Sequence, residues 1–164
     1  LTEKDLRLGR IVWCKNVEAH PDIGLVIFRE LFKQYPDIES YFVHLKGEQK
    51  DIYDSPLFRN HMTERVVPKL QEVFDTLDKP KELTDLMTRL GEYHAKLKVS
   101  THQVDNMLGV VVDALKSVMT EKMQPNEELA VRNCLRMAFA ITNGAIDKYE
   151  KEKLNVTRDT SKDR

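Results

Sequence analysis

Apolar residues recur three and four positions apart along almost the whole chain, and this period constrains the fold more than any other feature. Ile23, Ile27 and Leu31 are one example. Residues at these spacings share one face of an α-helix, whereas a half-buried strand alternates apolar and polar residues. No segment alternates with a period of two. The sequence therefore predicts an all-α fold, and 164 residues with 41% hydrophobic content suit a single domain.

Capping residues and prolines divide this pattern into separate helices. Thr2 with Asp5 predicts the first helix start, and Ser55 followed by Pro56 predicts another. We expect helices over about residues 3–19, 21–35, 56–77, 81–97, 101–122 and 125–152, a helical corner over 37–42 and a loop over 43–54. The apolar face of the first helix is expected to contain Leu6, Ile11, Val12 and Trp13.

Charge and cysteine content exclude several classes of protein. Lys and Arg total 26 against 27 Asp and Glu, so the net charge is −1. The chain therefore lacks the excess of positive charge that would indicate binding to nucleic acid or to an anionic membrane. No apolar run approaches the roughly 18 residues of a membrane span. Cys14 and Cys134 form no CxxC or CxxCH pattern; we expect both to be buried, in a cytoplasmic protein. The start at Leu1, without Met, predicts trimming or a longer parent chain.

Several residues and short motifs occur along the chain in an order and at spacings that are typical of one protein family. They are Trp13, Gly24, Phe28-Arg29-Glu30-Leu31-Phe32, Pro36, Phe42, Ser55-Pro56-Leu57-Phe58-Arg59-Asn60-His61 and Leu90-Gly91-Glu92-Tyr93-His94. Their order resembles the globin family, a haem-binding fold of about seven to eight helices. The pattern is similar to that of cytoglobins and invertebrate neuronal globins. The resemblance implies a globin domain over residues 1–153, with 154–164 as a charged, frayed tail.

The resemblance implies a haem site with His94 as the proximal iron ligand, since Leu90-Gly91-x-x-His94 matches the proximal motif. Phe42 would lie against the haem, and Gly24 would let the second helix cross the distal helix closely. Haem b would bind without covalent attachment, because no CxxCH is present. Lys98 would meet a haem propionate or remain solvated. The other expected pocket residues are apolar: Phe28, Leu45, Val66, Leu70, Leu90, Val99, Val104 and Met107.

The distal side departs from the family pattern by one residue. Counted forward from Ser55, the distal position falls on His61; counted back from Leu77, it falls on Met62. A continuous α-helix with His61 inward would turn Arg65 toward the haem, at a high cost in desolvation.

Two arrangements remain. A π-bulge or kink between His61 and Pro68 would keep His61 toward the iron and Val66 in the pocket, and we favour this because Pro68 already disturbs the helix. The rival places Met62 inward, giving a five-coordinate iron or a His/Met pair.

With His61 and His94 both on the iron, the resemblance implies a six-coordinate globin acting in redox or gas sensing, or in electron transfer. Its partners would be a small gas (oxygen, nitric oxide or carbon monoxide) or an electron-transfer protein. One alternative is a reversible oxygen carrier or store. Others are incidental nitric oxide dioxygenase or nitrite reductase activity, and a helical signalling module without haem.

Overall fold

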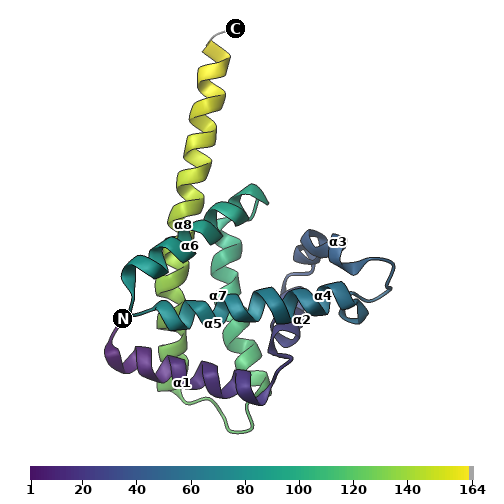
Figure 1. Ribbon diagram of the computed structural model, residues 1–164, viewed down its shortest axis with the longest axis vertical. Coiled ribbons are helices and arrows are strands. Elements are labelled where there is room, and N and C mark those ends of the chain that lie inside the picture. The colour runs from purple at the N-terminus through teal and green to yellow at the C-terminus, as the bar shows by residue number, and fades with distance from the viewer. Residues whose placement is uncertain (163–164) are drawn as a thin grey trace.

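A computed structural model describes residues 1–162, and this part of the chain is helical and contains no strand (Figure 1). The all-α expectation is confirmed. The α-helices are α1 (Glu3–Ala19), α2 (Ile23–Gln34), α3 (Val43–Lys46), α4 (Pro56–His61), α5 (Val67–Thr76), α6 (Pro80–Lys96), α7 (Thr101–Val118) and α8 (Pro125–Lys162). Two 3-10 helices, Pro36–Phe42 and Ile52–Asp54, and a π-helical turn, Met62–Val66, lie between them.

Three helices begin at capping residues, whereas α2 begins at Ile23 and not at Pro21 as expected. The hydroxyl of Thr2 accepts a hydrogen bond from the Asp5 amide (3.1 Å) at the start of α1. Ser55 accepts from the Phe58 amide at the start of α4, and Ser100 and Gln103 form a reciprocal capping box on α7. Each bond satisfies an amide that the helix itself leaves without a partner.

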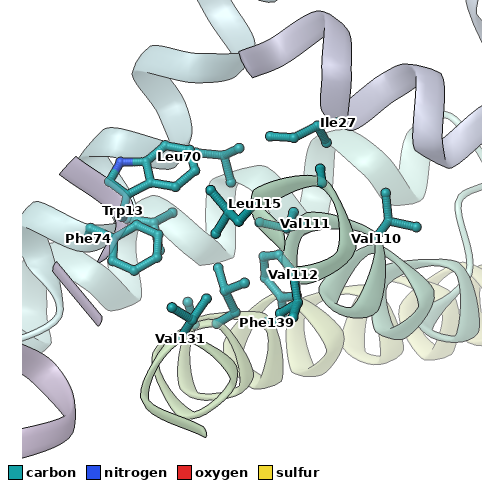
Figure 2. Packing of buried hydrophobic residues seen from close by; sticks show 14 of the residues in the cluster. Trp13, Ile27, Leu70, Phe74, Val110, Val111, Val112, Leu115, Val131 and Phe139 are labelled. Carbon is teal, nitrogen blue, oxygen red and sulfur yellow. The ribbon is translucent and has the colours of Figure 1, made fainter. Parts of the chain in front are cut away.

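The core lies where α8 packs against α1, α6 and α7, and α7 also packs against α2. Figure 2 shows Trp13 beside Phe74, with Leu115 and the valines of α7 to their right. The rings of Trp13 and Phe74 stack with centroids 5.0 Å apart, and the indole donates to the Gln71 side chain (2.9 Å). Trp13 is completely buried, so its expected core role is confirmed. Ile11 is 54% exposed, because it lies on the opposite face of α1, and that part of the expectation is wrong.

The expected loop over residues 43–54 is wrong in two places. Residues Val43–Lys46 form α3, and Ile52–Asp54 form a 3-10 helix. Ile52 is 1% exposed and anchors this segment in the core. The side chain of Asp51 accepts from the Tyr53 amide (2.9 Å), which closes the short helix. This stretch contains few apolar residues, and its helices are too short to show a helical spacing of apolar residues in the sequence.

The end of the chain also differs from expectation. The helix α8 continues to Lys162 instead of fraying after Leu154, and Figure 1 shows it rising well beyond the rest of the fold. Every residue from 150 to 162 is exposed. Opposite charges spaced four apart, such as Asp147 with Lys151 and Lys148 with Glu152, favour a helix that has no packing partner. Residues 163–164 of the expected tail lie outside the described part. The preceding helix, α7, ends at Val118 rather than near residue 122 as expected.

The two cysteines differ in their surroundings. Cys14 is half-buried, so its expected burial is only partial, whereas Cys134 is fully buried and its expectation is confirmed. Burial raises the pKa of the Cys134 thiol to about 11. The thiolate is the reactive form of cysteine, so both the high pKa of Cys134 and its burial protect it from alkylation and oxidation.

We therefore expect iodoacetamide at pH 8 to modify Cys14 alone in the folded protein. Mass mapping of the alkylated sites checks this. Denaturant serves as the control, since it should make both cysteines reactive. Equal labelling of Cys134 in native buffer would contradict the packing of α8 against α1.

The segment Met62–Val66 forms a π-helical turn, which confirms the bulge expected between His61 and Pro68. We call it the π segment. The Val67 amide donates to the carbonyl of Met62, five residues back, instead of four. Pro68 has no amide hydrogen and its ring crowds the carbonyl of Glu64, so a regular α-helix is disfavoured at this point. Arg65 is exposed, so the register mismatch places no guanidinium in the core.

Candidate functional site

The helix α2 crosses the distal segment at Gly24. A Cβ atom at Gly24 would lie 2.9 Å from Val67 Cγ2 and 3.1 Å from Met62 Cβ, so only glycine fits this crossing. Met62 is 1% exposed. Met62 is therefore buried, with its Cβ at the crossing between α2 and the π segment.

His61 is the last residue of α4 and directly precedes the π segment. Its imidazole is half-buried. Burial lowers the pKa of His61 below its usual value, and the nearby charges of Arg65 and His44 lower it further. These causes favour the neutral ring, the form of imidazole that binds metals.

The proximal side depends on Gly91 in α6. A Cβ atom at Gly91 would lie 2.7 Å from both Ala145 Cβ and the Thr142 carbonyl oxygen, so the glycine allows α6 to pack directly on α8. Nearly one turn later, His94 Nδ1 lies 2.7 Å from the Leu90 carbonyl oxygen. Because a carbonyl only accepts, this bond places the proton on Nδ1 and leaves a lone pair on Nε2. The half-buried ring of His94 is thus oriented by its own helix.

An aromatic cluster holds Phe42 in place. The ring of Phe28 meets Phe42 edge-on with centroids 5.2 Å apart, and Phe32 and Phe58 lie at 5.6 and 6.3 Å. Phe58 is completely buried. Such edge contacts are favourable for aromatic pairs and fix ring orientation. Phe42 itself remains half-buried, with part of its surface uncovered by protein.

The other expected pocket residues belong to one hydrophobic cluster, although they come from separate elements. Phe28, Leu70 and Val104 are 6%, 8% and 9% exposed. The remaining expected apolar residues are half-buried against the same cluster: Leu45, Val66, Leu90, Val99 and Met107. Lys98 is exposed and does not belong to this cluster; its backbone has a positive φ of 64°.

Sequence reasoning assigned no role at the site to three residues that lie close to it. Arg65 and His44 lie close enough to His61 to lower its pKa, and Phe58 completes the aromatic cluster around Phe42. Phe58 stands inside the Ser55–His61 motif, where its three-residue spacing from His61 was the available signal. The proximity of His44 to His61 had no such signal, because it depends on how α3 packs on α4.

Replacing Gly91 with alanine should destabilise the protein by about 1–3 kcal/mol, because the new methyl overlaps backbone atoms of α8 that cannot move independently. Urea unfolding followed by circular dichroism measures this loss. The matched control is Gly109→Ala on α7, where a Cβ atom meets nothing within 4 Å. That change should stabilise the protein by about 0.5–1 kcal/mol. Equal stability of the two variants would refute the close packing of α6 on α8.

The sequence profile of the globin family matches residues 25–141, which is most of the chain and includes His61 and His94. The chain belongs to the globin family. It is similar to a neuroglobin from Dissostichus mawsoni, at 32% identity over 106 residues, or 62% of this chain and 64% of that protein. The chain thus spans less than two thirds of the length of this relative.

Two solved globin structures share the fold. The haemoglobin of the botfly Gasterophilus intestinalis aligns with a TM-score of 0.75 at 18% identity, covering 90% of this chain and 99% of that one. Ferric Aplysia limacina myoglobin aligns with a TM-score of 0.74 at 19% identity, covering 88% and 98%. At these identities the likeness establishes the fold.

The residues of this globin fit the haem group that its family binds. A flat apolar macrocycle needs uncovered apolar surface and at least one axial ligand. The half-buried side chains around Phe42, Leu90 and Met107 supply that surface. His94, with its proton fixed on Nδ1, offers Nε2 as a ligand. Within residues 1–162, no helix is both long enough and apolar enough to cross a membrane.

Proposed function

We propose that this globin binds haem b non-covalently, with His94 and His61 as the two axial ligands, and acts in redox or gas sensing. His94 would hold the iron from α6, since the Leu90 carbonyl already orients its ring. Haem iron supplies the redox change and the binding of small gases. Phe28, Phe42, Val66 and Met107 would surround the macrocycle and exclude water from it.

One observation supports the assignment of His61 over its rival: Met62 is 1% exposed and its Cβ lies at the crossing with Gly24, so Met62 is part of the packing between α2 and the π segment. His61 is only half-buried, and burial lowers its pKa, which favours the neutral imidazole. A neutral imidazole with no competing task in the core is the better second ligand.

A gas molecule would then bind only when the His61 imidazole moves away. The apparent affinity would fall by the fraction of time that the site is open, so His61 would report ligand arrival by its own displacement. The site would discriminate among oxygen, nitric oxide and carbon monoxide by how well each competes with an imidazole.

Both cysteines are free, which is consistent with a cytoplasmic location.

Optical spectra of the purified ferric and ferrous protein test this function. Low-spin six-coordinate spectra in both states, without added ligand, are the expected result. A five-coordinate ferrous spectrum with rapid oxygen binding would instead favour the reversible oxygen carrier.

The non-covalent mode of binding gives a separate prediction. Neither Cys14 nor Cys134 lies in a CxxCH pattern, so acidified organic solvent should extract all of the haem from the protein as free haem b. Absorbance of the organic phase and the mass of the remaining polypeptide measure this. Haem retained by the denatured chain would contradict it.

A further inference from the structure

The distal helix contains one residue more than its contacts with α2 require. Met62 and Val67 both contact the position of a Gly24 Cβ atom, at 3.1 and 2.9 Å, although they are five residues apart. In a continuous α-helix the residues that share a face are three or four apart. The π segment resolves this spacing, since the Val67 amide donates to the Met62 carbonyl.

The extra residue has no role in packing. Thr63, Glu64 and Arg65 are all exposed. Glu64 and Arg65 also line, with Pro68, a surface hollow of about 380 Å³. The buried anchors lie on either side, at Phe58 and Leu70. The core therefore fixes the two ends of the distal helix but does not need three residues on its outer face.

Pro68 favours the π segment over an α-helical alternative. It cannot donate to the Glu64 carbonyl, and its ring crowds that oxygen in an α-helix. The extra residue forces a bulge somewhere between the anchors, and Pro68 helps to place it directly after His61. A π turn widens the helix and changes the direction of the side chains before it relative to those after it.

We propose that the π segment is the positioning element that sets the reach of His61 toward the haem iron. The inserted residue, in addition to the imidazole itself, then makes the site six-coordinate. This inference rests on the proposed axial pair of His61 and His94. Thr63, Glu64 and Arg65 act only through His61, so they are positioning residues and touch no ligand.

Deleting Thr63 in a Pro68→Ala background tests the proposal, because Met62 and Val67 become four apart and an α-helix can continue through them. We expect the ferric spectrum to change from low-spin to high-spin. Carbon monoxide should bind the reduced variant at least about tenfold faster, as expected when the sixth position is no longer blocked. Deleting Glu64 or Arg65 instead restores the same spacing and should give the same result.

Length-conserving variants are the matched controls. Thr63→Ala and Pro68→Ala alone keep the extra residue, so the bulge must persist between the anchors and both spectra should remain low-spin. In addition, His61→Ala should add nothing to the deletion, because both changes act through the same imidazole.

Three results would overturn the proposal. The first is a deletion variant that keeps the parent spectrum and the parent rate. The second is an effect of the deletion that multiplies with that of His61→Ala. The third is loss of haem from all three deletion variants while circular dichroism shows native helix content, since the segment would then close the pocket rather than position His61. A high-spin spectrum of the parent protein contradicts the axial pair itself and is seen before any deletion is made.

Discussion

Replacing His94 with alanine is expected to abolish stable haem binding. His94 is the residue whose ring is pre-oriented by its own helix, through the 2.7 Å contact with the Leu90 carbonyl. A ligand present at a hundred times its dissociation constant stabilises the folded state by about 2.7 kcal/mol, so loss of haem should also lower stability by that order. The haem-to-protein ratio after gel filtration and the midpoint of thermal unfolding measure the two effects.

The control for this substitution is His102→Ala, because His102 is exposed on α7 and lies outside the proximal motif. It should retain the parent haem content and spectrum. Free imidazole added to the His94→Ala protein should restore part of the haem binding by replacing the lost ligand. Normal haem content and an unchanged axial spectrum in His94→Ala, without imidazole, would reject His94 as the proximal ligand.

Local signals in the sequence were sufficient where a single residue determines the backbone. Thr2, Ser55 and Ser100 each accept from an amide three residues on, so the helix starts could be predicted from side-chain chemistry alone. The same holds for Gly24, whose close contact with the distal helix follows from the absence of a side chain.

The bulge was predictable for a different reason, because two local rules disagreed. The cap at Ser55 fixed one register and the apolar face leading to Leu77 fixed another, one residue apart. Both registers exist in the structure, joined by the π segment. The disagreement itself was therefore the signal, and it pointed to the place where the helix departs from regular geometry.

The remaining errors arise where tertiary packing or its absence decides. The burial of Ile52 orders the segment after α3, although the surrounding sequence is polar. In α8 the opposite occurs: residues 150–162 have no packing partner and still remain helical. Of the two side chains that lower the His61 pKa, Arg65 follows four residues later in the π segment, whereas His44 comes near His61 only through the packing of α3 on α4.

Replacing His61 with alanine is the second large change, and it should convert a low-spin ferric haem into a high-spin or water-bound one. The sixth position would then be open at all times instead of a small fraction of the time. If the site is open for about 1% of the time in the parent, the affinity for carbon monoxide rises about 100-fold. Rapid mixing with carbon monoxide, together with the ferric spectrum, measures both consequences.

The matched variant is Met62→Leu, which removes the thioether while keeping the volume that fills the crossing with Gly24. It should leave the spectrum and the binding rate unchanged, because Met62 is 1% exposed and its Cβ lies at that crossing. A thioether ligand would also hold the reduction potential above that of a second imidazole. If Met62→Leu opens the sixth position or lowers the potential while His61→Ala does neither, the distal ligand is the methionine and the forward register from Ser55 is wrong.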